Sequence, residues 1–300
     1  MQNNRPFPQV LLLGNGVNRA YGGNDWTKLI KTMKSNPKVR FDDIKEIPFP
    51  LQVILATGNN VDISIKNNQK LFYGTVEVEA VKHPLRRLLE IGFDHILTTN
   101  YSYEIERSAG ACTQIDGSDC VKCMGHTRVV KRAESKYLLH TYNEVNFNDK
   151  TCKIWHIHGE ARKRSSIVIG HYNYGKLIAK YYEELEKHKN TLYERQKAGR
   201  PIIIDSWLDA FILGDVHVLG FGFDMSEIDL WWLLHRKQQE KAEHGMVYFY
   251  EPGGGDPIKL SLLDVYDVSV NNLCYLSEPE DYRQFYDTAI MNIYKALNSI

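Results

Sequence analysis

A histidine stands at the end of a predicted buried strand. His158 follows the apolar run at residues 154–157, and Gly159 beside it would leave room for a ligand. Because imidazole titrates near neutral pH, His158 could act as a general base toward a ribose hydroxyl. Strand alternation puts His156 on the same side, and we interpret His156 as a buried structural histidine. The plainer interpretation of His158 is also structural, but its position at a turn favours a functional role.

An asparagine follows a second predicted strand, His95–Thr98. The trio Thr98-Thr99-Asn100 offers two hydroxyls and a neutral amide. Such an amide can hold a ribose hydroxyl or orient a water molecule without adding charge. Taken alone, the trio is better explained as a strand end with a turn-forming asparagine.

A glycine-rich turn follows the first predicted strand, Val10–Leu13. Gly14-Asn15-Gly16 would let the backbone approach a pyrophosphate, and the next helix would add N–H groups and a partial positive charge. The third glycine of the hydride-transfer fingerprint is missing, and no P-loop motif occurs. A simple strand-to-helix turn is the alternative.

A second glycine pair, Gly220-Phe221-Gly222, follows the predicted strand Val216–Leu219. We expect Ser226 to cap a helix running from Glu227 to about residue 240. Glu227 and Asp229 then lie where acidic side chains stabilise a helix N-terminus. The alternative is that one of them binds an adenosine ribose.

Strands that alternate with helices predict an α/β fold with a doubly wound, Rossmann-like parallel sheet. In such sheets ligands bind beyond the carboxyl ends of the strands. The two glycine turns, the Asn100 turn and the His158 turn all follow predicted strands, so we expect them to converge on one crevice.

We expect one domain over residues 1–300, with helical or irregular insertions near 45–90 and 108–150 and a helical arm near 177–197. Further strands are predicted at Ile167–Ile169, Met246–Tyr250 and Val265–Val270, and a terminal helix at Asp281–Leu297.

Composition narrows the class of protein. The chain has 37 basic and 37 acidic residues and a formal net charge of zero, which does not indicate nucleic-acid binding. No apolar run approaches the length of a membrane span, and no signal peptide is apparent, so we expect a cytoplasmic protein.

The cysteines raise a zinc question. The chain has five of them: Cys112, Cys120, Cys123, Cys152 and Cys274. An odd number suits reduced thiols in a cytoplasm. Cys120 and Cys123 have the spacing of a zinc ligand pair, and Cys112, Cys152 or His126 could complete a site, but a second closely spaced pair is missing. We therefore expect no metal.

Together these motifs resemble the sirtuin-like superfamily of NAD-consuming domains, in order and over most of the chain. "LLLGNGVN" resembles the family's phosphate loop, with Asn15 and Asn18 replacing alanine and serine. "LTTNY" places Asn100 at the catalytic asparagine, and "WHIHGE" places His158 at the catalytic histidine. "LGFGFDMSEIDLWWLL" is similar to the late nucleotide-contacting loop and helix, with Gly222 where many members carry serine. The first and third stretches are also similar to the abortive-infection H family of phage-resistance proteins.

The chain departs from this pattern in three places. Sirtuin deacylases carry a four-cysteine zinc module after the His-Gly motif, whereas here only Cys274 follows it, which argues against protein deacylation. Ser102 replaces an acidic residue, and Glu104 and Glu106 are the candidates for its role. The loop around Asp25 lacks the arginine that is expected to cover nicotinamide.

The resemblance implies an NAD+ glycohydrolase that gives nicotinamide and ADP-ribose, or a cyclised product. Asn100 would position the ribose or water, and His158 would act as base. The residues implied in binding NAD+ are Gly14, Asn15, Gly16, Asn18, Asp25, Thr98, Thr99, Gly220, Phe221 and Gly222. The alternatives are a nucleotide-binding regulatory module without turnover and an ADP-ribosyltransferase.

The zinc-lacking bacterial branch of the family is similar to antiphage effectors that cleave NAD+. Such effectors are silent until an assembly or infection signal activates them. The resemblance therefore implies a homo-oligomer or a partner protein, such as an ATPase or nuclease of the same defence system, as the trigger.

Overall fold

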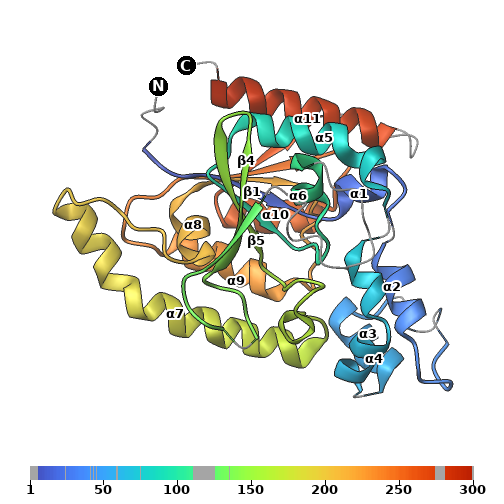
Figure 1. Cartoon of the computed structure of the whole chain (residues 1–300). Coiled ribbons are helices and arrows are strands. Elements are labelled where there is room, and N and C mark those ends of the chain that lie inside the picture. Colours follow the sequence, from blue (N-terminus) through green and yellow to red (C-terminus); the bar gives the residue numbers. More distant parts are fainter. Residues whose placement is uncertain are drawn as a thin grey trace.

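The computed structural model describes residues 6–23, 25–40, 42, 44, 46–58, 60–74, 76–110, 126–134, 136–273 and 281–298. An 8-stranded sheet crosses the centre of the molecule in the order β3-β4-β5-β2-β1-β6-β7-β8 (Figure 1). Its strands are β1 Gln9–Leu13, β2 His95–Thr98, β3 His126–Val130, β4 Thr141–Phe147, β5 Lys150–His156, β6 Asp215–Leu219, β7 Val247–Glu251 and β8 Val268–Asn272.

Strand direction confirms the doubly wound fold. Neighbours from β5 through β2, β1, β6 and β7 to β8 pair in parallel, whereas β3 and β4 extend the sheet antiparallel. The chain moves outward from β1 to β2 and β5, then returns to place β6 on the other side of β1. This reversal between β1 and β6 is the position at which α/β sheets of this kind bind ligands.

Alternating side chains of the buried strands feed two helical layers. Val10 and Leu12 pack into one core, and Leu11 and Leu13 into the other. One layer holds α1 Gly16–Ala20, α5 Val78–Ile91, α6 Glu104–Ala109 and α11 Asp281–Asn298; the other holds α7 His171–Lys197, α8 Trp207–Leu213, α9 Ile228–Gln238 and α10 Pro257–Val265. In Figure 1, α5 and α11 lie above the sheet, and α7 and α9 below it.

A helical lobe lies beside the carboxyl ends of the strands. It contains α2 Trp26–Met33, α3 Phe49–Thr57, α4 Val61–Asn67 and the 3-10 helix Gln69–Tyr73, and it stands to one side of the sheet in Figure 1. Its core includes Ile30, Val53 and Phe72, packed with Tyr101 and Ile167 from the loops that follow β2 and β5. The lobe therefore walls the edge of the sheet where the predicted site residues emerge.

Two sequence-based expectations about the middle of the chain were wrong. Residues 126–130 and 141–147 are strands β3 and β4, not an irregular cap, because β4 pairs with β5 from Asn143–Ile154 to Phe147–Lys150. Ile167–Ile169 is not a strand of the sheet. This segment is hydrogen-bonded to the turn after β5, where Val168 N–H donates to His158 O at 2.8 Å.

The second half of the chain brings three further corrections. The helix expected from residue 177 begins at His171, and Leu177, Tyr181 and Leu185 are buried, so its first half is core rather than arm. Ser226 does not cap α9; its hydroxyl donates to Asp224 instead, and the helix begins at Ile228. Residues 257–265 form α10, which moves the last strand to Val268–Asn272.

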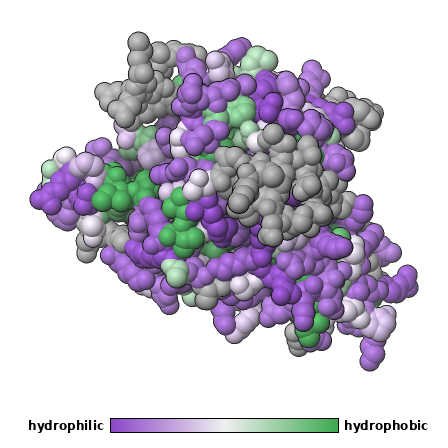
Figure 2. Space-filling view, viewed as in Figure 1, coloured by the Kyte–Doolittle hydropathy of each residue, from purple (hydrophilic) through white to green (hydrophobic). Residues whose placement is uncertain are grey.

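The surface is largely polar. Figure 2 shows polar side chains over most of the face seen in Figure 1, with hydrophobic residues in small groups between them. Among the described residues, no helix is both long enough and apolar enough to cross a bilayer.

Candidate functional site

The two glycine turns meet at the reversal between β1 and β6. Gly14 N–H donates to Leu219 O at 3.0 Å, and Gly16 N–H donates to Gly220 O at 2.7 Å. A Cβ on Gly14 would lie 2.3 Å from Gly220 O, closer than any side chain tolerates. At Gly222, by contrast, a Cβ would meet nothing within 4 Å. The first glycines thus permit contact between the two turns, and Gly222 faces open space.

A cleft of about 320 Å³ opens beside these turns. Its walls include Asn15, Gly16, Thr99, Gly220, Phe221, Gly222 and, from the start of α9, Glu227. We call it the glycine cleft. The exposed Arg19 also lines it and is a cation available to a phosphate group.

A smaller cavity of about 70 Å³ adjoins the glycine cleft, and we call it the asparagine cavity. Its lining includes the predicted site residues Asn18, Asp25 and Asn100. Asn15 and Trp26 line both spaces, so the two lie side by side at the switch point. Trp26 is held there by the ring of Phe49, whose centroid is 4.7 Å away.

Asn100 is fixed through its backbone. Its N–H donates to Thr98 Oγ1 at 3.1 Å, and its carbonyl accepts from His156 Nδ1 at 2.8 Å. Thr98 Oγ1 in turn donates to Leu13 O at 3.0 Å. This fully buried threonine lines neither space, so it positions Asn100 rather than contacting a ligand. The Asn100 amide makes no hydrogen bond with another described residue, so it is available to a ligand.

His156 has the structural role that its sequence position indicated. Its Nε2 lies 2.9 Å from Glu106 Oε1, which also accepts from Asn143 Nδ2 at 2.8 Å. Burial lowers the pKa of His156, but the charge and hydrogen bond of Glu106 outweigh burial and leave that pKa raised. Glu106 is therefore committed to holding the segment that carries Asn100.

Of the two acidic candidates after Asn100, Glu104 is the one that reaches a cavity. It lines the asparagine cavity and accepts a hydrogen bond from Ser102 Oγ. Burial raises the pKa of its carboxyl group. Ser102 and Glu104 together thus present a polar wall in the place where the sequence lacks the expected acidic residue.

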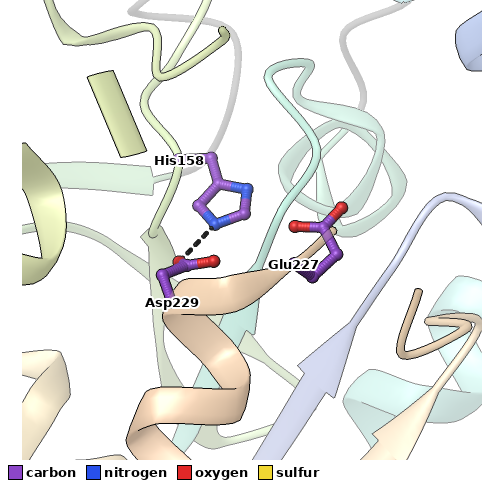
Figure 3. Close-up of side chains that lie close together, drawn as sticks. All are labelled: His158, Glu227 and Asp229. Atoms are coloured by element: carbon purple, nitrogen blue, oxygen red, sulfur yellow. Dashed lines mark hydrogen bonds and ion pairs between the residues drawn. The ribbon is translucent and has the colours of Figure 1, made fainter. Parts of the chain in front are cut away.

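His158 is buried, with 1% of its surface exposed, and it lines neither space. Its Nε2 lies 2.9 Å from Asp229 Oδ2, and Figure 3 shows Glu227 beside the same ring. The expectation that Gly159 leaves room for a ligand was wrong. A Cβ there would lie 2.1 Å from Ser166 O, so the space is filled by backbone.

Charge is concentrated around this histidine. Burial lowers the pKa of His158, but Asp229 and then Glu227 outweigh burial and leave that pKa raised. Burial raises the pKa of Glu227 to about 7, against the opposing effect of His158. The three side chains offer ligand atoms within 4.8 Å of one another, atom types that a divalent cation also takes.

Asp229 and Glu227 are the functional candidates that the sequence only partly revealed. Their position near a helix start suggested N-terminal stabilisation, yet Glu227 makes no side-chain cap and Asp229 is fully buried against His158. The available signal was the Glu-x-Asp pair at the start of the helix that follows a glycine turn.

The zinc question lies mainly outside the described residues. Cys112, Cys120, Cys123 and Cys274 and the side chain of His126 are not described. Cys152 is a buried free thiol in β5, and burial raises its pKa. This thiol is therefore an inert part of the core.

The chain matches a known protein family over its central and later parts. A family described as SIR2-like domain matches residues 94–270, more than half of the 300-residue chain. The match contains the Asn100, His158 and Gly220–Gly222 motifs, while the first glycine turn lies before it. No curated protein matches the chain significantly.

Proposed function

Because the chain belongs to the SIR2-like domain family, we propose that it is an NAD+ hydrolase that breaks the nicotinamide–ribose bond. The family assignment supports a reaction that uses NAD+. The more specific proposal, hydrolysis, rests on the arrangement of residues at the switch point.

The observation that carries the proposal is that the glycine cleft and the asparagine cavity lie side by side. Asn15 and Trp26 line both spaces, and the amide of Asn100, which makes no hydrogen bond with another described residue, lies in the smaller one. A dinucleotide has a bulky half, a pyrophosphate and a small ring, and it needs an elongated site of this kind. The glycine turns suit the pyrophosphate, because backbone can approach it closely.

The chemistry follows from the groups present. Breaking the bond sends its electron pair to the positively charged nicotinamide ring and leaves an oxocarbenium-like ribose. The neutral Asn100 amide orients the ribose or a water molecule, which forms the new bond to the ribose carbon. His158, held by Asp229, supplies the basic group that ultimately holds the proton of this water.

The test is direct. Purified protein at graded concentrations is incubated with NAD+, and nicotinamide and ADP-ribose are quantified. We expect one nicotinamide per NAD+ consumed, together with ADP-ribose or its cyclised form. Saturable binding without nicotinamide release at every concentration, with or without candidate partners, would contradict the proposal. Radiolabel that moves from NAD+ to protein or nucleic acid would indicate an ADP-ribosyltransferase instead.

We further propose that this hydrolase is an antiphage effector, activated by homo-oligomerisation or by an ATPase or nuclease partner. The support is the resemblance of the first glycine turn and the His158 motif to phage-resistance proteins. Cells that express the protein should lose NAD+ on infection, whereas cells with Asn100→Ala should not. Equal NAD+ levels in both infected cultures would contradict this role.

A further inference from the structure

The three groups of the buried cluster differ in their access to the cleft. Glu227 lines the glycine cleft and is 8% exposed, whereas His158 and Asp229 are 1% and 0% exposed and line neither space. A substrate in the cleft would therefore meet the carboxylate first. His158, at the family's catalytic position, is buried beneath Glu227.

We propose that Glu227 is a further catalytic residue, which takes the proton of the attacking water and shares it with His158. This inference rests on the proposed NAD+ hydrolysis. It adds a group that faces the cleft and makes the His158–Asp229 pair the acceptor behind it.

Hydrogen bonding identifies which nitrogen of the His158 ring donates to Asp229. A carboxylate only accepts, so the 2.9 Å contact means that His158 Nε2–H donates to Asp229 Oδ2. In the neutral ring Nδ1 is then the accepting nitrogen, and it makes no hydrogen bond with a described residue. Tyr181 OH also donates to Asp229 Oδ2, at 3.3 Å, which helps to hold this carboxylate in place.

The geometry brings Glu227 to the same ring. Its carboxylate lies within the 4.8 Å cluster and, in Figure 3, is turned toward His158. Tyr174 OH donates to Glu227 Oε2 at 3.3 Å and stacks edge-on against His158 at 5.4 Å. Thr99, which precedes Asn100, lines the glycine cleft together with Glu227. Glu227 therefore faces the same cleft as the residue next to Asn100.

The proposed step balances. The ribose carbon loses its bond to nicotinamide, which leaves as a neutral molecule with the electron pair. The water oxygen forms the new bond to that carbon, and one of its protons passes to the cluster. Glu227 takes this proton, and His158 Nδ1 can accept it in turn. Return of the proton to solvent restores the resting state, so no co-reactant is needed.

Electrostatics supports a group that changes charge near neutral pH. Burial raises the pKa of Glu227 to about 7, while His158 favours its ionised form. The other titratable groups around it are Asp224, Asp229, Tyr101, Tyr174 and Tyr181, and Arg19 lines the same cleft. A base must be ionised to act, so kcat/KM should rise as pH increases through this pKa.

The test compares Glu227→Gln, Glu227→Asp and the control Glu243→Gln. Gln keeps the size and the acceptor oxygen for Tyr174 but cannot take a proton. Glu243 is exposed and lines neither space. We expect Glu227→Gln to lower kcat by roughly 100-fold, the usual size of a lost general base. Its KM should stay within about threefold, its pH–rate rise should vanish, and Glu227→Asp should recover part of the rate.

The possible outcomes distinguish the role of Glu227 from NAD+ hydrolysis itself. Wild-type rates in a folded Glu227→Gln, as judged by circular dichroism and NAD+ calorimetry, would overturn this inference and leave NAD+ hydrolysis standing. No hydrolysis by the wild type would overturn both. A stoichiometric divalent cation in the purified wild type, lost in Glu227→Gln, would also overturn it, because the cluster would then be a metal site.

Discussion

Gly14 and Gly222 belong to the two glycine turns, but different contacts constrain them. A methyl group on Gly14 would meet the backbone of Gly220 and Phe221 at 2.3 and 2.7 Å, whereas a methyl group on Gly222 would meet nothing within 4 Å. The sequence placed both glycines in a phosphate-binding role. Atomic contacts assign the first to packing of the turns and leave the second open to a ligand.

This difference predicts that only one of the two substitutions to alanine lowers stability appreciably. Gly14→Ala should lower the free energy of unfolding by roughly 1–3 kcal/mol, the usual cost of overpacking. Gly222→Ala should change it by less than about 0.5 kcal/mol, as surface substitutions do. Urea unfolding of both variants checks this, and equal stabilities would refute the assignment.

The buried pair Glu106–His156 predicts a pH-dependent stability. Glu106 has a pKa lowered from 4.5, so its contribution is lost as pH falls through that lowered value. His156 has a pKa raised from 6.5, so its contribution is lost as pH rises through that raised value. Glu106→Gln should therefore cost roughly 3–5 kcal/mol between these limits, as breaking a buried pair does. A cost that does not change from pH 3 to pH 9, measured by denaturant unfolding, would contradict this pairing.

Among the strands, the sequence pattern predicted those whose own residues favour a buried strand. The strands β1, β2 and β6 are short apolar runs followed by glycine or polar turns, and they were predicted within one residue. The strands β3 and β4 are more polar, and they join the sheet because β4 pairs with β5 and β3 pairs with β4. Ile167 and Ile169 fill the lobe core and Val168 packs into a core of the sheet, so the apolar composition of this segment gave a misleading strand prediction.

The helix α2, which carries Trp26 into the wall of both spaces, depends on its cap. Asp25 accepts a hydrogen bond from Lys28 N at 2.9 Å. Asp25→Ala should cost about 1 kcal/mol of stability, a common value for losing a cap, while Asp25→Asn should keep most of it. Thermal unfolding of the two variants measures the difference. An equal loss of stability in Asp25→Asn and Asp25→Ala would show that charge, rather than capping, is what matters.

At the scale of the molecule, the site is made by contacts that a sequence does not display. His158 and Asp229 are 71 residues apart and meet because the turn after β5 packs on the start of α9. Motif order predicted that Asn100, His158 and the glycine turns would gather at one sheet edge, and the structure does place their turns there. It could not predict that His158 lies behind Glu227, because the depth of a side chain depends on packing of the whole fold.

NAD+ cleavage that depends on Asn100 is tested most directly by measuring binding and cleavage separately in Asn100→Ala. This amide lines the asparagine cavity and holds no described part of the fold, so its loss should leave folding intact. NAD+ affinity by calorimetry and nicotinamide release by chromatography are measured on the same wild-type and variant samples. The account predicts that wild-type protein binds and cleaves NAD+, whereas Asn100→Ala binds it within about tenfold and releases at least 100-fold less nicotinamide, the scale of a lost positioning group. Equal nicotinamide release by the two proteins would contradict it.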